Sequence, residues 1–412
     1  MSSSNQKRVV VTGMGGISPI GNDWESVKAK LKAGTNGVEV MEDWAQYDGL
    51  RTRLGAPVEA YELPAHYTRK VMRSMGKVAL YATLSSENAL RDAGLLGHDI
   101  IKSGMTGIAY GSSTGTPESI ADFGRMLINQ NIDELSANSY IRMMPHTTTS
   151  NIGIFFGITG RIIPSSTACT SGSISIGYAY EAIKAGKQTV MLAGGAEELC
   201  ATEAAVFDIL YATEIDNENP HLCPKPFDES RKGLVVGEGA ATLVLEDYDF
   251  AIARGANIYA EIIGFGTNSD GVHVTNPNKV TMARAMALAL EDAGIEARDV
   301  DYINAHGTAT DKGDVAESHA TYDVFGGDVA FAGLKGHIGH TLAAAGSLEA
   351  WMSLHMLREG WFAPNLNLKD LDPRCANLNY IKNEPLKLDA KTIMTNNFAF
   401  GGVNTSLIFR KH

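Results

Sequence analysis

Cys169 is the residue whose surroundings point most directly to nucleophilic chemistry. It lies in the stretch SSTACTSG at residues 165–172, where a predicted strand gives way to a long helical pattern. The N–H groups at the start of a helix lack partners within it and favour an anion. That effect alone leaves a thiol of ordinary pKa, about 8.5, mostly protonated at pH 7. The sequence therefore predicts a nucleophilic Cys169 with an imidazole beside it, or else a small buried side chain.

Two histidines in glycine-rich turns are the candidate imidazoles. His306 lies in NAHGTAT after an apolar run, and His340 lies in LKGHIGH near the start of a helical pattern. A helix N-terminus lowers the pKa of His, and a neutral imidazole can donate a hydrogen bond to a developing oxyanion. His337 and His340 have an i,i+3 spacing that a metal could use, but no third ligand is visible, so no metal is expected. Lys335 is either solvated or buried and paired with an acid such as Glu317.

The segment NNFAFGGVN at residues 396–404 is rich in glycine and aromatic side chains. Its backbone N–H groups could form an oxyanion hole and one of its rings could gate a pocket, although an ordinary hairpin would have the same composition. Cys200, Cys223 and Cys375 lie in sequence contexts without such features and are expected to be structural.

The elements that position these residues follow an alternating pattern. Short apolar runs at 8–12, 107–110, 189–193, 241–245, 300–304 and 329–332 are separated by helical stretches, which indicates α/β layers with buried sheets. ALRDAG at 89–94 and ALEDAG at 289–294 suggest a duplication, with halves at 1–256 and 257–412 and an extra segment at about 116–150 of the first. Gly13-x-Gly15 is followed by Ser18, so a tight strand-to-helix turn is predicted instead of a dinucleotide site.

Composition excludes several other classes of protein. The chain has 412 residues, with 35 Lys+Arg against 47 Asp+Glu and a net charge of −12, which disfavours nucleic acid as a partner. Four Cys without a CxxC pair exclude a disulfide framework. The sequence contains no run of 18 apolar residues and no secretory segment at its start, so we expect no membrane span and a cytoplasmic location.

Six ordered segments together resemble the elongating β-ketoacyl-acyl carrier protein synthases of the thiolase superfamily. They are RVVVTGMGGISPIG, TACTSG, PFDESRKGLVVGEGAATLVLED, NAHGTAT, GLKGHIGHTLAAAG and NNFAFGGVN. The resemblance spans nearly the whole chain. It implies an α/β fold of two βαβαβαββ halves stacked as a five-layered αβαβα sandwich, in a homodimer.

The resemblance also implies a role for each matching residue. Cys169 would accept the acyl group, with His306 and His340 flanking the thioester and Lys335 supporting them through an ionic network that includes Glu317. Thr308 and Thr310 would bind the phosphopantetheine arm, with Phe398 beside the substrate. Phe400 would be the gate, and its N–H and that of Cys169 would form the oxyanion hole. The implied reaction is a decarboxylative Claisen condensation with malonyl-acyl carrier protein. The arm belongs to the carrier, so the enzyme is expected to need no cofactor of its own.

Several departures from the family pattern leave the acyl substrate open. The turn at 111–116 reads GSSTGT and places Thr114 about where family members set chain length. Ala399 replaces a glycine in the gating loop, which should stiffen it. A ketosynthase of a specialised polyene or polyketide pathway, with a chain-length partner subunit, remains an alternative. A degradative thiolase is disfavoured because Cys375 is followed by Ala376 and Asn377, so its CxG motif is missing. His340 disfavours a chain-initiating synthase, which has Asn there, and Cys169 disfavours a silent partner subunit.

Carrier docking requires a local basic surface, because acyl carrier proteins are acidic and this chain is negative overall. Arg69, Lys70 and Arg73 lie within five residues and would form one stripe on a helix. A solvated helix face is the alternative for these three residues.

Overall fold

Two half-sheets of the same strand order form the centre of the computed structural model, which describes residues 6–412. The first runs β5 (Ile162–Ser165), β4 (Thr106–Gly111), β6 (Val190–Glu197), β8 (Gly239–Asp247) and β1 (Val9–Ile17). The second runs β11 (Ala330–Gly333), β10 (Tyr302–Ala305), β15 (Thr392–Phe398), β16 (Val403–Lys411) and β9 (Ala260–Ser269), with β13 (Asn379–Tyr380) outside β11. In each half-sheet, the first three strands run parallel to one another, and each of the last two runs antiparallel to the strand before it. The matching orders confirm the duplication.

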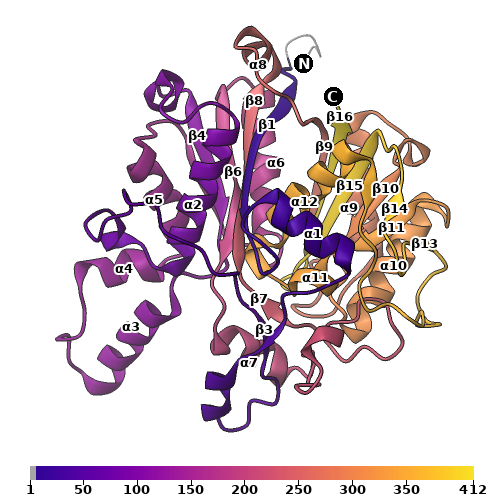
Figure 1. Cartoon of the computed structure of the whole chain (residues 1–412), viewed down its shortest axis with the longest axis horizontal. Helices are drawn as coiled ribbons and strands as arrows, with labels where there is room; N and C mark the ends of the chain where they lie inside the picture. Colours follow the sequence, from indigo (N-terminus) through magenta and orange to yellow (C-terminus); the bar gives the residue numbers. More distant parts are fainter. Residues whose placement is uncertain (1–5) are drawn as a thin grey trace.

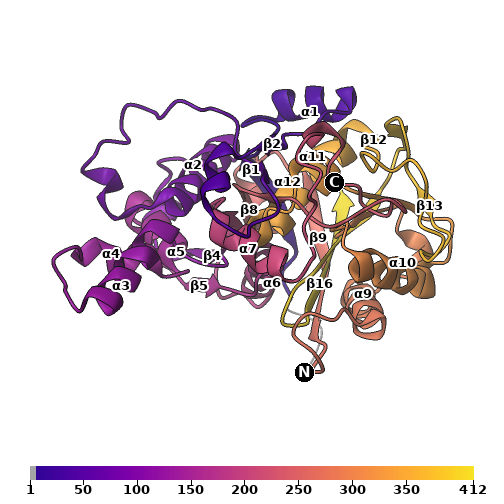
Figure 2. The same ribbon diagram turned by 90° about the horizontal axis from the view of Figure 1, so that it is seen from below.

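The half-sheets join edge to edge where Val9–Val11 of β1 pair with Ala260–Ile262 of β9. Helices α6 (Ser171–Lys184) and α12 (Ala345–Glu359) pack against strands of both half-sheets and fill the space between them (Figures 1 and 2). The outer layers are α2 (Lys77–Asp92) with α5 (Thr147–Phe156), and α9 (Lys279–Ala293) with α10 (Asp311–Phe325). This arrangement is the predicted five-layered αβαβα sandwich.

Paired glycines on the first strand of each half let an outer helix approach the sheet closely. A Cβ atom at Gly13 would lie 2.4 Å from the carbonyl oxygen of Ala89 in α2. A Cβ atom at the equivalent Gly264 of β9 would lie 2.3 Å from the carbonyl oxygen of Ala289 in α9. The predicted strand-to-helix turn at Gly13–Gly15 is therefore wrong, because β1 continues through both glycines to Ile17.

The first half carries two helices for which the second half has no counterpart. α3 (Pro117–Asn129) and α4 (Ala137–Met143) come between β4 and α5, and they project from the body of the molecule (Figure 1). Between β10 and β11 the second half has α10 alone. The predicted extra segment at about 116–150 contains α3, α4 and the first residues of α5.

The remaining elements are short or lie at the surface. They are α1 (Trp24–Ala33), α7 (Ala201–Ile209), α8 (Tyr248–Ala253), α11 (Lys335–Ile338), a sheet of β2 (Glu39–Val40), β3 (Leu54–Ala56) and β7 (Val236–Gly237), and a pair of β12 (Trp361–Phe362) with β14 (Leu386–Lys387). The predicted boundary at 256 falls between α8 and β9; the first five residues of the predicted first half lie outside the described part of the chain. Within residues 6–412, no helix has the length and apolar character to cross a lipid bilayer.

Candidate active site

The Cys169 thiol lies in the tight turn that joins β5 to α6. β5 ends at Ser165 and α6 begins at Ser171, and Ala168 takes a left-handed backbone conformation with φ of 50°. The turn is closed by side-chain hydrogen bonds: the N–H of Thr167 donates to the hydroxyl of Ser171, which donates to the carbonyl oxygen of Ala168. A strained turn of small residues therefore presents a buried sulfur just before the helix.

His340 and His306 approach the sulfur from the second half of the chain. Nε2 of His340 lies 3.1 Å from Sγ of Cys169, and the centroids of the two imidazole rings are 5.2 Å apart at nearly a right angle. One ring nitrogen of each histidine and the sulfur all lie within 4.8 Å of one another. The three side chains therefore face one reaction space.

The hydrogen-bond partners of the two histidines assign the same tautomer to both. The backbone N–H of Leu342 lies 3.3 Å from Nδ1 of His340, so this nitrogen accepts and Nε2 carries the hydrogen. Nδ1 of His306 faces two donors, Nζ of Lys335 at 3.2 Å and Nδ2 of Asn397 at 3.3 Å. Each neutral imidazole thus keeps an Nε2–H donor available to the reaction space.

Lys335 forms a buried ion pair with Glu349. Its Nζ lies 2.5 Å from Oε1 of Glu349 and 2.5 Å from the carbonyl oxygen of His306. Asn397 donates to the other oxygen of Glu349 at 2.7 Å. The expected pairing of Lys335 with Glu317 is wrong, because Glu317 instead accepts the backbone N–H groups of His306 at 2.7 Å and Gly307 at 2.8 Å. Glu317 holds the histidine turn and Glu349 holds the lysine.

Burial dominates the electrostatics of the site. It lowers the pKa of both His306 and His340 well below the ordinary value, and the nearby charge of Lys335 lowers both further. Both imidazoles are therefore neutral at physiological pH, with burial as the largest cause.

The predicted lowering of the thiol pKa is wrong. Burial raises the pKa of Cys169 to about 11, although the charge of Lys335 and the N–H groups of Phe400 and of Cys169 itself act in the opposite direction. The two N–H groups lie against the sulfur, which is the arrangement that an oxyanion hole requires. The resting thiol therefore keeps its proton at neutral pH.

A hairpin between β15 and β16 covers the thiol. The Phe400 ring packs against that of Phe207 of α7, with centroids 5.3 Å apart, while Phe398 lies 6.1 Å from His306. The segment at 270–274 is tied to the hairpin, because the N–H of Gly401 donates to Val274 at 2.7 Å. Phe400 therefore belongs to a covering layer built from three separate segments.

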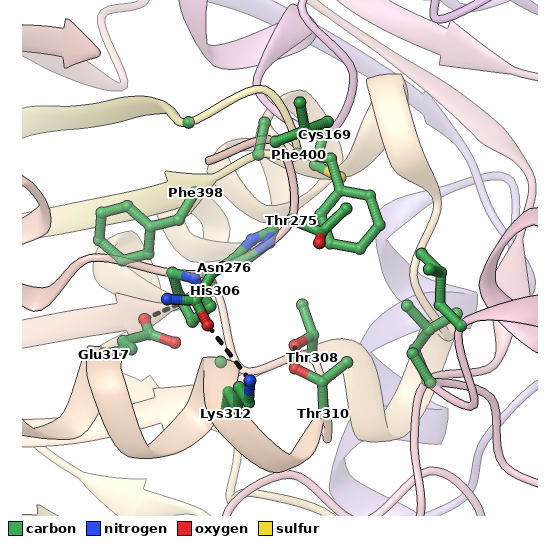
Figure 3. A pocket seen from close by; sticks show the side chains of 18 of the residues that line it. Cys169, Thr275, Asn276, His306, Thr308, Thr310, Lys312, Glu317, Phe398 and Phe400 are labelled. Carbon is green, nitrogen blue, oxygen red and sulfur yellow. Dashed lines mark hydrogen bonds between the residues drawn. The ribbon is translucent and has the colours of Figure 1, made fainter. Parts of the chain in front are cut away.

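A cavity of about 380 Å³ leads to the thiol and is lined by both predicted threonines. In Figure 3, Thr308 and Thr310 lie below Cys169 and Phe400, and Lys312 lies to the left of Thr310. The hydroxyl oxygens of the two threonines are 2.9 Å apart, and a Cβ atom at Gly313 would lie 2.4 Å from the hydroxyl oxygen of Thr310. Gly313 therefore leaves room for the two hydroxyls to face the cavity.

The cluster of Cys169, His306 and His340 has donor atoms close enough to share a metal ion. The buried ammonium of Lys335, 3.2 Å from His306, opposes a second cation at this place. His337 does not contribute, because its ring nitrogens lie 3.1 Å from the carbonyl oxygen of Thr35 and 3.2 Å from that of Pro364. The donor set therefore suits hydrogen bonding better than metal binding.

Thr114 does not lie among the residues that line the cavity. The turn that contains Thr114 contacts the C-terminal end of α4 instead. The N–H of Thr116 donates to the carbonyl oxygen of Arg142, and a Cβ atom at Gly115 would lie 2.2 Å from that oxygen. The role predicted for Thr114 in setting acyl chain length therefore stays a prediction.

The predicted docking stripe is also not formed as expected. Arg69, Lys70 and Arg73 are exposed, but they lie in a turn and in a 3₁₀-helix at Val71–Ser74 and not on an α-helix. None of the three lines the cavity. The i,i+3 pair Lys70 and Arg73 matches the three-residue period of a 3₁₀-helix, whereas Arg69 precedes this helix.

Sequence reasoning missed Glu349, Asn397 and Arg231. Glu349 could have been found, because it is the single charged residue between His340 and Leu357. Arg231, from the PFDESR segment, donates to the carbonyl oxygens of Thr310 at 3.1 Å and Asp311 at 2.8 Å and so holds the threonine turn. A motif match located this segment without indicating what the arginine does.

Comparison with known proteins agrees with this geometry. Residues 6–251 match the model of the beta-ketoacyl synthase N-terminal domain, and residues 259–369 match that of the C-terminal domain. The 3-oxoacyl-[acyl-carrier-protein] synthase 1 of Haemophilus influenzae is 36% identical over 98% of this chain and 99% of its own. A solved beta-ketoacyl synthase from Burkholderia phymatum STM815 is 56% identical with a TM-score of 0.97, over 98% of this chain and 100% of that one.

A second solved structure carries a carrier protein. It is described as AntDE:AntF, a type II polyketide synthase acyl-carrier protein in complex with its ketosynthase bound to the hexaketide. It is 28% identical with a TM-score of 0.88, over 99% of this chain and 100% of that one. Sequence and fold thus agree along the whole length with the arrangement around Cys169, and the chain belongs to the beta-ketoacyl synthase family.

Proposed function

We propose that this protein is a 3-oxoacyl-[acyl-carrier-protein] synthase, an acyltransferase that lengthens fatty acyl chains by decarboxylative Claisen condensation. The observation that carries this proposal is the pair of neutral imidazoles that present Nε2–H donors beside one buried sulfur. A hydrolase would need a base that accepts a proton from the nucleophile. Two donors suit the stabilisation of a thioester enolate instead.

The first half-reaction moves the acyl group from the carrier to the enzyme. Sγ of Cys169 attacks the thioester carbon, and the N–H groups of Cys169 and Phe400 stabilise the oxyanion. The bond from that carbon to the arm sulfur then breaks. The thiol proton of Cys169 ends on the departing arm sulfur, so acyl-Cys169 forms and a free arm thiol leaves.

The second half-reaction consumes malonyl carrier. Its thioester oxygen accepts hydrogen bonds from the Nε2–H groups of His306 and His340 while the C–C bond to the carboxylate breaks and carbon dioxide leaves. The resulting carbanion attacks the acyl carbon on Cys169. The same oxyanion hole acts again, the C–S bond breaks, the Cys169 thiolate takes up a proton from solvent water, and 3-oxoacyl carrier is released. Loss of carbon dioxide drives the condensation.

We infer that the partner is an acyl carrier protein, which brings its own phosphopantetheine arm, so that the enzyme needs no cofactor. Support comes from the curated relative's name and from the solved ketosynthase in complex with an acyl-carrier protein. Docking at Arg69, Lys70 and Arg73 stays a prediction. Four Cys without a CxxC pair fit a reducing compartment, and the cytosol is our proposed location.

We further propose a homodimer formed along β5. This strand is the terminal strand of the large sheet, and Ile162 on it is 46% exposed. An exposed edge strand with apolar side chains is a template for pairing with another chain. A polyketide pathway is the second candidate function, favoured by the 28% identical ketosynthase, but the 36% identical 3-oxoacyl synthase supports fatty acid elongation more strongly.

The test of the proposed function uses the Cys169→Ala variant with acyl and malonyl carriers. We expect condensation to disappear while slow decarboxylation of malonyl carrier continues, because both histidines remain. Mass spectrometry of the carrier-bound products measures both reactions and reports the chain lengths that the wild type makes. Condensation at the wild-type rate by Cys169→Ala would show that the assignment is wrong.

A further inference from the structure

Lys312 occupies the outer end of the catalytic cavity, where the cavity meets a second hollow. Both are lined by Asn276, Pro277, Asp311 and Lys312, and the second has a volume of about 310 Å³. Figure 3 shows Lys312 beside Asn276 on the side of the cavity away from Cys169. Any ligand that reaches the thiol by this route passes the Lys312 ammonium.

The other cations of the second hollow are already neutralised by acids. Lys279 pairs with Asp323 at 3.1 Å, and Arg374 pairs with Asp311 at 2.7 Å and with Asp372 at 2.7 Å. Nζ of Lys312 contacts only the neutral side-chain oxygen of Asn276, at 3.3 Å. Among the residues that the structure describes, no carboxylate oxygen lies within 4.0 Å of it. Lys312 is therefore a cation without an acidic partner on a protein of net charge −12.

The neighbouring carboxylate of Asp311 does not supply that partner. Its side chain is drawn toward Arg374, while the backbone carbonyl oxygen of Asp311 accepts from Arg231 at 2.8 Å. Lys312 also lies in the first turn of α10, where unpaired backbone N–H groups add positive potential. Both features favour an anion beside Lys312.

The proposed substrate has one anionic group that must come to this place. A phosphopantetheine arm carries its thioester at one end and its phosphate at the other, where it joins the carrier. With the thioester at Cys169 and the arm beside Thr308 and Thr310, the phosphate lies where the arm leaves the cavity. Lys312 follows Thr310 by two residues on that path.

We propose that Lys312 binds the phosphate of the carrier's phosphopantetheine arm and so distinguishes phosphorylated from unphosphorylated acyl donors. This inference rests on the proposed function. Lys312 is a binding residue in it and takes no part in the chemical step.

The experiment compares two small acyl donors that lack the carrier protein. One is an acyl thioester of pantetheine and the other is the same thioester of 4′-phosphopantetheine. The rate of Cys169 acylation is measured by mass spectrometry of the intact protein at donor concentrations below saturation. We expect the wild type to react about threefold faster with the phosphorylated donor, as for a solvent-exposed ion pair, and the ratio to fall with added salt.

Lys312→Gln should react equally with the two donors, because it lacks the charge, and Lys312→Arg should keep most of the preference. Lys279→Gln is the matched control, since that lysine is already paired, and it should retain the wild-type ratio. Equal rates of the wild type with both donors would overturn the proposal. An unchanged ratio in Lys312→Gln would overturn it as well. Failure of the proposed function would look different, because then neither donor nor an acyl carrier would acylate Cys169.

Discussion

Lys335 has two tasks at the residue scale, and they can be separated. It balances the buried charge of Glu349, and its own charge helps to keep His306 and His340 neutral. Lys335→Met leaves the buried Glu349 without its ion-pair partner, which costs about 3–5 kcal/mol of stability. It also lets the pKa of His306 rise. Protonation of His306 then begins at higher pH, so the acid limb of the decarboxylation pH profile should move to higher pH.

The measurement is carbon dioxide release from malonyl carrier from about pH 4 to about pH 8, beside thermal unfolding of each variant. Lys335→Met combined with Glu349→Gln removes both charges and is the control. It should recover stability and return the acid limb toward the wild-type position. An acid limb that stays in place in Lys335→Met would mean that burial alone keeps His306 neutral.

At this scale, prediction from the sequence succeeded where a single residue carries the chemistry. Cys169, His306 and His340 stand in short glycine-rich segments, and the structure brings them together. Prediction from the sequence failed for the thiol pKa, which depends on how deeply the side chain is buried. The thiol pKa is raised because desolvation outweighs every nearby positive charge, and the extent of burial depends on segments distant in sequence.

At the scale of elements, the β15–β16 hairpin holds the N–H of Phe400 against the sulfur. Gly401 and Gly402 both have positive φ, at 89° and 72°. A Cβ atom at Gly402 would lie 2.7 Å from the Cβ atom of Asp270, whereas a Cβ atom at Gly401 would meet no atom within 4 Å. Gly401→Ala should therefore cost about 1 kcal/mol of backbone strain, and Gly402→Ala should in addition displace the segment at 270–274.

The two glycine variants form a matched pair. We expect acylation of Cys169 to slow by at least tenfold more in Gly402→Ala than in Gly401→Ala, because only the former separates the hairpin from its support. Stopped-flow or quenched acylation with one acyl carrier measures the difference. Equal rates for the two variants would exclude a role for the contact with Asp270.

The end of β6 places a carboxyl group behind the active site. Glu197 accepts from the N–H of Ala343 at 3.0 Å and from the backbone N–H of Ser113 at 3.3 Å. Burial raises the pKa of Glu197 above its ordinary 4.5, and burial together with the charge of Glu197 raises that of its neighbour Glu203. The folded protein thus binds a proton at this pair of carboxyl groups more tightly than the unfolded chain does. Its stability should therefore fall as pH rises above about 4.5, until the pair has lost that proton in the folded state.

Glu197→Gln removes this ionisation with little change of shape. Urea unfolding at pH 5, 6, 7 and 8 measures the free energy of unfolding. The stability of Glu197→Gln relative to the wild type should increase as the pH rises. Glu42→Gln, at an exposed position, controls for the loss of one negative charge. A constant difference between wild type and Glu197→Gln across this range would contradict the raised pKa.

The elements themselves were largely predictable, because buried strands read as apolar runs and the repeated ALxDAG segments mark equivalent helices. The glycine pairs at 13–15 and 264–266 carry the same information, since each faces one of those helices. The sequence pattern at Gly13–Gly15 predicts a turn, whereas the structure has a continuous strand there. Close helix–sheet contact requires glycine just as a turn does, and the sequence alone does not distinguish the two.

At the scale of the whole molecule, the site depends on both halves of the duplication. Cys169 comes from the first half, and His306, His340 and Phe400 come from the second. α6 and α12 lie next to each other between the half-sheets, so the two equivalent turns that precede them meet at one place. Duplication predicts this meeting, but the pairing of Lys335 with Glu349 depends on side-chain packing that no short motif specifies.

The final prediction concerns the edge of the large sheet. On β5 and the preceding α5, Ile162 is 46% and Ile154 77% exposed, which leaves an apolar surface beside unpaired strand hydrogen-bonding groups. If a second copy covers this surface, charges placed there should separate the dimer. Ile154→Asp with Ile162→Asp should give a monomer by light scattering after size exclusion. Val280→Asp on α9, 67% exposed, adds one charge to the opposite outer layer and should leave the dimer intact. A wild type that is monomeric at micromolar concentration would exclude this interface. A doubly substituted variant that stays dimeric would place the interface elsewhere.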